Sequence, residues 1–353
     1  MSSATAPTVT AVTPPVLDLL LPHGQLLASR VHPQADAIRR EHDAWFRQAL
    51  AGLQLPGSER LFGPCEGVSL MCRVLPDADP ERLVGICVAA SALFLLDDVA
   101  DDEAVERARA DDYLAVLRDA APSTSSAPLL LLARTLTRAR QGVAPRIWAR
   151  FVSGFSEVIA AGAGKSGTAT RIDGYDAYLA ARRADSAIDL VGVAIEHGLG
   201  LDLDLTVRQV AREVADAGAA GGLPTWEEFH NACFRHTILV NDLLSFRKEF
   251  FGGEPMNAVT VLCEQEGLPL QQAVDAVCIR IARAEADFLS SARALRELGT
   301  PELDAYLTAW ELMLSGNLVW SLGCPRYHGA DARPWPSGVP KRMELHRDRT
   351  VFS

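Results

Sequence analysis

The chain has 353 residues, of which 48% are hydrophobic and 22% are charged, so it can bury a large core and is not disordered as a whole. Its 34 basic and 45 acidic side chains give a formal net charge of −11, which disfavours nucleic acids and anionic membrane surfaces as partners. No apolar run approaches the roughly 20 residues that span a bilayer, and the seven cysteines form no CxxC pair, so we expect a cytoplasmic protein without membrane insertion.

Apolar stripes at helical spacing dominate the sequence and predict an all-α fold. The first residues are rich in Ser, Thr, Ala and Pro and predict a flexible tail over 1–21. A single helical domain is expected over 22–328, followed by a polar, Pro-rich C-terminal tail over 329–353. Within the domain, helices are expected over residues 33–50, 80–98, 145–161, 175–196, 226–252, 271–298 and 301–322.

Local start and stop signals support three of these helices. Asp79 followed by Pro80 is typical of a helix start, with the aspartate as cap and the proline in the first turn. Thr225 opens a capping box, and Gly253 ends the same helix. Thr300 precedes the last long helix and is its expected cap.

An acidic cluster follows the most hydrophobic expected helix. Asp97, Asp98, Asp101 and Asp102 place four carboxylates within six residues, near a helix C-terminus where the helix dipole disfavours negative charge. Like charges four residues apart on a helix also repel one another. A solvated acidic helix end is one explanation, and a bound hard cation such as Mg²⁺ is the other.

A second polar pattern lies within the expected helix over 226–252. Asn241, Ser245 and Glu249 recur every four residues, so at about 100° per residue they spread over about 80° of the helix surface. We call these three residues the NSE stripe. Oxygen ligands on one stripe fit a divalent-metal site, and Lys248 could reach an anion held there; a chance polar face is the alternative.

Two residue pairs that contain arginine complete the candidate site residues. Arg182 and Arg183 lie in the expected helix over 175–196, and Arg326 with Tyr327 follows the last long helix. Each pair alone is also common on protein surfaces. Their significance depends on their combination with the aspartate cluster and the NSE stripe.

Taken together, these patterns resemble a bacterial class I terpene synthase. Residues 97–101 match its DDxxD motif, residues 241–249 match its NDxxSxxxE motif, and residues 326–327 match its C-terminal RY pair. The resemblance covers roughly residues 22–328. It implies a single-domain helical bundle around a central apolar active-site cavity.

The resemblance also implies a metal-dependent mechanism. Three Mg²⁺ ions would lie between the aspartate motif (Asp97, Asp98 and Asp101) and the NSE stripe, with Asp97 as the most consistent ligand. The ions and basic residues would hold a prenyl diphosphate. Closure of the site would then release diphosphate and leave an allylic cation that cyclises.

Further roles follow from the same resemblance. Arg182 would sense diphosphate, with Arg183 as the alternative because the spacing to the NSE stripe is longer than usual; an Ala/Gly-rich insertion over 215–224 explains that spacing. Asp185 would be the linker between sensor and effector, and Ser186 would be the effector, acting through its backbone carbonyl.

The remaining contacts to the substrate are expected at the C-terminal end. Lys248, Arg326 and Tyr327 would bind diphosphate, and the tail over 329–353 would become ordered as the site closes. Phe94, one turn before the aspartate motif, and Trp320 are expected to face the carbocation. Phe151 or Phe155 could line another wall, and core packing is the alternative role for all these rings.

Two other functions fit parts of the pattern. A chain-elongating prenyl diphosphate synthase would carry a second DDxxD motif, whereas this chain has NDxxSxxxE. A non-catalytic helical interaction protein would leave both acidic patterns unexplained. Small residues within the aspartate motif favour a C20 substrate over a C15 substrate, and a homodimer is left open.

Overall fold

The computed structural model describes residues 14–22, 25–62, 67–100, 103–123, 125–165, 174–203, 226–253, 255–297, 299–333, 335 and 338–353. Within these ranges, the side chains of residues 60, 96–100, 103–109, 161–165, 184 and 185 are outside the description. The described chain is mostly helical, as the sequence predicts.

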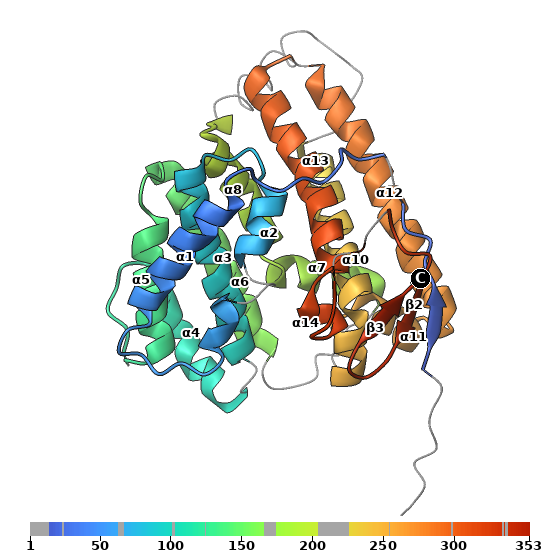
Figure 1. Cartoon of the computed structure of the whole chain (residues 1–353), viewed down its shortest axis with the longest axis horizontal. Helices are drawn as coiled ribbons and strands as arrows, with labels where there is room; N and C mark the ends of the chain where they lie inside the picture. The colour runs from blue at the N-terminus through green and yellow to red at the C-terminus, as the bar shows by residue number, and fades with distance from the viewer. Residues whose placement is uncertain are drawn as a thin grey trace, which may run out of the picture.

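The N-terminal part of the fold contains helices of moderate length. In chain order they are α1 (Ala35–Ala49), the 3₁₀ helix η1 (Ser58–Phe62), α2 (Gly67–Val74), α3 (Pro80–Ala100), α4 (Glu103–Leu117), α5 (Ala127–Ala139) and α6 (Pro145–Lys165). The C-terminal part adds α7 (Tyr175–Asp185), α8 (Ile188–Leu199), α10 (Trp226–Gly252), α11 (Ala258–Gln265), α12 (Leu270–Arg296), α13 (Pro301–Leu322) and the short α14 (Pro325–His328). Figure 1 shows α1–α5 on one side and α11, α12 and the strands on the other, with α10 and α13 between them.

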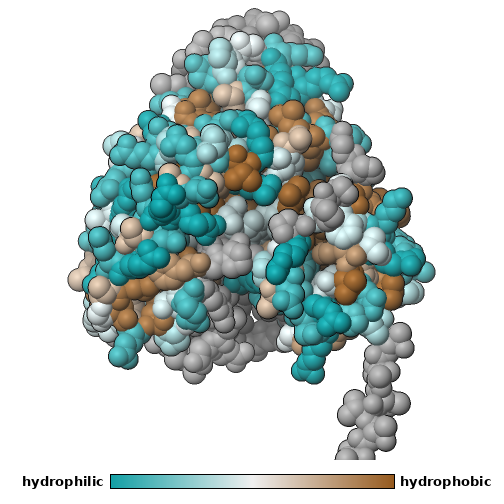
Figure 2. Space-filling model, viewed as in Figure 1, coloured by the Kyte–Doolittle hydropathy of each residue, from teal (hydrophilic) through white to brown (hydrophobic). Residues whose placement is uncertain are grey.

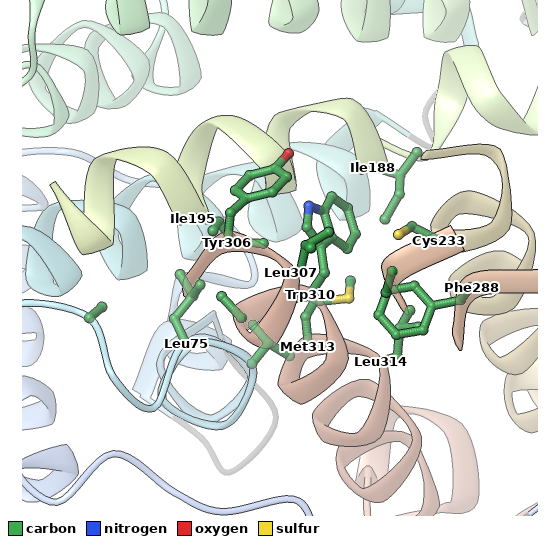
Figure 3. Close-up of a cluster of buried hydrophobic side chains, with 14 of the residues drawn as sticks. Leu75, Ile188, Ile195, Cys233, Phe288, Tyr306, Leu307, Trp310, Met313 and Leu314 are labelled. Carbon is green, nitrogen blue, oxygen red and sulfur yellow. The ribbon is translucent and has the colours of Figure 1, made fainter. Parts of the chain in front are cut away.

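The largest buried cluster surrounds α13. This helix packs against α2, α8 and α10, so nearly its whole circumference is apolar, as expected of a helix enclosed by others. Figure 3 shows how side chains of several helices meet there. The labelled residues are Leu75, Ile188, Ile195, Cys233, Phe288, Tyr306, Leu307, Trp310, Met313 and Leu314.

Several expected helix ends are confirmed by backbone geometry. Asp79 Oδ1 accepts a hydrogen bond of 3.0 Å from Arg82 N, so it caps α3 as predicted. Gly253 follows α10 with φ +74°, a conformation that glycine adopts without a steric penalty. Thr300 precedes α13, but its side chain makes no capping hydrogen bond. Thr225 lies outside the described residues.

The helix expected over 175–196 is broken. α7 ends at Asp185 and α8 begins at Ile188, and Ala187 between them has φ 55°, in the left-handed region. The Ser186 hydroxyl contributes to the break, because it donates to Arg183 O (3.3 Å) and accepts from Ile188 N (3.4 Å). No Gly or Pro lies between Asp185 and Ile188 to indicate the break.

A small antiparallel sheet corrects the prediction of flexible tails for residues 16–18 and 342–352, while residues 1–13 lie outside the description. β1 (Val16–Asp18) pairs with β2 (Arg342–Leu345), and β2 pairs with β3 (Thr350–Phe352). Leucines of the N-terminal segment and Met343 of β2 are buried in one cluster with residues of α11 and α12. The pairing joins opposite ends of the chain through strands of three or four residues, too short for a clear alternating pattern.

The surface drawn in Figure 2 is largely hydrophilic, with small apolar patches between polar side chains. Within the described part of the chain, no helix is both long enough and apolar enough to span a membrane.

Candidate active site

The NSE stripe lies on α10, as the sequence predicts, and two of its members bind other segments. Asn241 Oδ1 accepts from Arg182 Nη2 (3.1 Å), and Asn241 Nδ2 donates to the Tyr327 hydroxyl (2.7 Å). Glu249 Oε2 accepts from Asn257 Nδ2 (2.7 Å) just before α11. The amide of Asn241 therefore lies between the basic residue of α7 and the phenol of α14.

Ser245 and Glu249 of the stripe fit a divalent cation. The Ser245 hydroxyl is buried and makes no hydrogen bond of good geometry. Burial and the negative charge of Asp242 raise the pKa of Glu249 to about 6, although Ser245 and Asn257 oppose the rise. A buried hydroxyl and a carboxylate whose charged form is disfavoured by burial are oxygen ligands that a hard cation would satisfy.

A buried carboxylate beside the stripe was missed by the sequence analysis. Asp242 is fully buried and accepts from Arg182 Nη2 (2.8 Å), from Ala258 N (2.7 Å) and from the Tyr178 hydroxyl. It therefore joins α7 and α11 to α10. A buried acid nearly always needs a partner, and its position beside Asn241 was the signal that could have pointed to it.

The two arginines of α7 point to different surroundings. Arg182 bonds to Asn241 and Asp242, beside the NSE stripe. Arg183 instead pairs with Asp189 (3.1 Å), and its guanidinium lies 5.4 Å from the Phe234 ring centroid. The geometry therefore brings Arg182, and not Arg183, to the predicted metal stripe.

Aromatic side chains connect α3 with α14. Phe94 and Trp320 are stacked with centroids 6.4 Å apart, and Trp320 meets Tyr327 edge-on at 5.7 Å. Trp320 Nε1 donates to Ser69 Oγ (3.0 Å), which fixes the indole. We call Phe94, Trp320 and Tyr327 the aromatic row. Phe155, the other candidate wall, packs instead in a separate cluster.

Tyr327 is a buried phenol at the end of this row. Burial raises its pKa well above the ordinary value, even though the positive charge of Arg326 acts in the opposite direction. The phenol is therefore protonated at neutral pH. Because its oxygen accepts from Asn241, its own proton remains available to donate to a ligand.

The other predicted residues are placed less completely. Asp97 and Asp98 lie in the last turn of α3, and Asp185 ends α7, but their side chains are outside the description, as is all of Asp101. Lys248 is exposed on α10. A cavity of about 600 Å³ between α4 and α5 is lined by none of the candidate site residues.

Comparison with known proteins identifies the family of the chain. The family model described as "Terpene synthase family 2, C-terminal metal binding" matches residues 89–287, more than half of the chain. The chain belongs to this terpene synthase family. It is a class I terpene cyclase, which argues against both the chain-elongating enzyme and the non-catalytic interaction protein.

Individual relatives agree with this assignment. The chain is 28% identical over 315 residues to "(3S,6E)-nerolidol synthase" of Selaginella moellendorffii, covering 84% of this chain and 80% of that one. It is 28% identical over 336 residues to "(+)-germacrene D synthase" of the same organism, covering 88% and 91%. The solved structure of germacradien-4-ol synthase from Streptomyces citricolor superposes with a TM-score of 0.67 at 19% identity, covering 84% of this chain and 96% of that chain, which supports the fold.

Proposed function

We propose that the protein ionises and cyclises a linear prenyl diphosphate of 15 or 20 carbons in a Mg²⁺-dependent reaction that releases diphosphate. One observation carries the proposal: Arg182 from α7 and Tyr327 from α14 both bind Asn241, the first residue of the NSE stripe. A positively charged hydrogen-bond donor and a phenol therefore meet at Asn241, the first of the three oxygen ligands on α10.

The residues that would hold the metal are the NSE stripe on α10 and, from the sequence pattern, Asp97, Asp98 and Asp101 at the end of α3. When bound, divalent ions act as Lewis acids and neutralise the charge on the departing diphosphate. The protein carries a net charge of −11, so a polyanionic headgroup needs such compensation here.

The basic and phenolic groups would bind the diphosphate oxygens. Arg182 has a planar guanidinium suited to two parallel hydrogen bonds, and Tyr327 offers its hydroxyl proton. Lys248 and Arg326 would add charge at the periphery. Arg182 already donates to Asn241 of the NSE stripe. A bound headgroup would compete for this donor, and the resulting shift of the Arg182 side chain would act on α7.

The break after α7 would contribute at the reacting carbon. Ser186 lies at the break, and its N–H donates to Arg182 O (2.9 Å). A displacement of the Arg182 backbone would therefore move Ser186. We expect the Ser186 carbonyl to face the developing cation, with Asp185 connecting the two positions.

The aromatic row would stabilise the cation after ionisation. Phe94 is half-buried and Trp320 is buried, and a cation over a desolvated ring gains about 2 kcal/mol or more. Their stacking also restricts entry of water to the cation from that side.

The length of the substrate is a finer part of the proposal. Val99 and Ala100 are small residues inside the aspartate motif and favour a C20 chain. The relatives named for nerolidol and germacrene D are named for C15 products and favour a C15 chain. Product analysis with both diphosphates separates the two expectations.

The deciding experiment measures diphosphate release and volatile products from C15 and C20 prenyl diphosphates, with Mg²⁺ and with excess chelator. We expect turnover only with the metal, and loss of most turnover in Glu249→Gln. Glu264→Gln changes an exposed glutamate of α11 and is the matched control. Full activity in chelator, or equal activity of the two variants, would contradict the proposal.

A further inference from the structure

A buried arginine lies on the side of α10 opposite to the NSE stripe. At about 100° per residue, Arg247 lies about 160° or more from both Ser245 and Glu249 around the helix. Its side chain is buried, yet it pairs with no carboxylate at hydrogen-bond distance among the described residues. Arg247 Nε donates to Tyr327 O (2.7 Å), and Arg247 Nη1 donates to Arg347 O (2.7 Å).

The two acceptors of Arg247 show which parts of the chain it holds together. Both are backbone carbonyls, and they belong to two segments, α14 and the loop between β2 and β3. A contact with the main chain fixes the path of the chain whatever side chain the acceptor residue carries. Burial lowers the pKa of Arg247, with partial compensation from Asp348, so the charge is kept inside the protein at a cost.

Independent contacts join the same two segments. We call residues 342–352, which form β2, β3 and their loop, the C-terminal hairpin. His328 donates through Nε2 to Ser321 O (2.8 Å) and accepts through Nδ1 from the Thr350 hydroxyl (3.1 Å), and its ring meets Phe352 at 4.7 Å. The tautomer follows from the carbonyl acceptor at Nε2.

The approach of the backbones is also close. Gly329 has φ +97°, and a Cβ placed on it would lie 2.3 Å from Asp348 O, so the chain leaving α14 touches the hairpin loop directly. Contacts join α14 to both α10 and β3, and Figure 1 shows α14 beside α10.

The C-terminal hairpin is itself held to the body of the protein. β2 pairs with β1 from the N-terminal segment, and Arg342 Nε donates to Asp18 Oδ1 (2.9 Å). Gln271 of α12 donates to Asp18 O (3.1 Å) and accepts from Asp18 N (2.9 Å). Met343 is buried in the cluster formed with α11 and α12.

We propose that Arg247 is a positioning residue that, with the C-terminal hairpin, holds α14 in place before any ligand binds, so that the Tyr327 hydroxyl meets Asn241. This inference rests on the proposed function for its catalytic consequence. It differs from the expectation that the tail becomes ordered only on closure, and exchange measured on the ligand-free protein distinguishes the two.

The structural half of the proposal is tested by hydrogen exchange of the full-length, ligand-free protein. The amides of Tyr327, His328 and Gly329 bond to carbonyls in and next to α14 and report its order. Arg247→Met keeps the aliphatic stem and removes the donors. We expect these amides to exchange about tenfold faster or more, since hydrogen bonds of a charged donor carry at least that weight. Exchange in α12 should not change.

Two variants serve as comparisons. Arg349→Met removes an exposed arginine of the same hairpin, whose guanidinium pairs with the adjacent Asp348, and it should leave exchange in α14 unchanged. Arg247→Lys retains a charged donor and should restore part of the protection. If Arg247→Met does not fold, Thr350→Val tests the same tie through His328. Unchanged exchange in α14 in the folded variants would overturn the proposal.

The functional half is tested by a double-mutant cycle on kcat. We expect Arg247→Met to lower kcat about tenfold and to raise the share of alcohol products formed by water capture. In a Tyr327→Phe background the same substitution should have less than about a threefold effect, because residues that act through one another are not additive. Equal effects in both backgrounds would show that Arg247 is merely structural. If the wild type releases no diphosphate, the proposed function fails. The exchange measurement then still tests whether Arg247 holds α14 in place.

Discussion

The most consequential substitution that the structure suggests is Asp242→Asn. Asp242 is fully buried, and its partner Arg182 is only 13% exposed, so the ion pair of 2.8 Å lies within the protein. The asparagine keeps the size of the side chain but removes the carboxylate charge that pairs with Arg182 and directs an amide towards existing donors. Removing one member of a buried pair costs about 3–5 kcal/mol in the free energy of unfolding. We expect a loss in that range, measured by chemical denaturation of the metal-free protein.

The control for this experiment is Asp18→Asn. Asp18 pairs with Arg342 at 2.9 Å, but both side chains are more than half exposed, so the expected loss is below about 1 kcal/mol. Adding Arg182→Met to Asp242→Asn should recover part of the lost stability, because both charges are then absent. A loss for Asp242→Asn no larger than that of the control would refute the role that we assign to the buried network.

Three further predictions concern the site and its surroundings. Binding of Mn²⁺, followed by electron paramagnetic resonance, should weaken as the pH falls through about 6, where Glu249 takes up a proton, and Glu249→Gln should remove this step. Phe94→Ala should change the product mixture more than KM, as measured by gas chromatography; an unchanged mixture would make Phe94 a core residue. Burial lowers the pKa of His328 from 6.5 to about 4, so below pH 6.5 the unfolded chain binds a proton that the folded chain does not. His328 should therefore contribute about 2 kcal/mol to the fall in the free energy of unfolding between pH 7 and pH 5, and the fall should be smaller by about that amount in His328→Asn.

The helices were predictable because their signals are local. α13 begins at Pro301 and ends at Leu322, as expected from apolar spacing and the proline at its start. α3 begins where Asp79 caps it. The division between α7 and α8 was not predictable in the same way, because the residue in the left-handed region is Ala187 and not a glycine.

The sheet was missed for a different reason. Val16 pairs with Glu344, so the strands gain their hydrogen bonds only after the whole domain has brought the two ends of the chain together. Neither strand has enough residues to show a period of two. Polar, Pro-rich terminal segments were therefore interpreted as flexible tails.

The candidate site shows the same distinction. The NSE stripe was found because its three residues recur within one helix. Tyr178, Asp242 and Asn257 were not singled out, because their importance arises from contacts between α7, α10 and α11. Arg247 gave no signal at all, since an arginine in a helix is ordinarily interpreted as exposed.

The contacts of α10 also explain why residues so close in sequence should respond differently to substitution. At about 100° per residue, Asn241, Asp242 and Arg247 point in directions separated by about 100° to 140°. The first direction carries the metal stripe, the second binds α7 and α11, and the third binds α14 and the C-terminal hairpin. Within the stripe, Ser245→Ala should therefore impair chemistry at little cost in stability, whereas Asn241 and Glu249 also hold hydrogen bonds to Arg182, Tyr327 and Asn257. Substitutions in the other two directions should release segments that carry Arg182 and Tyr327, and so they should impair stability and chemistry together.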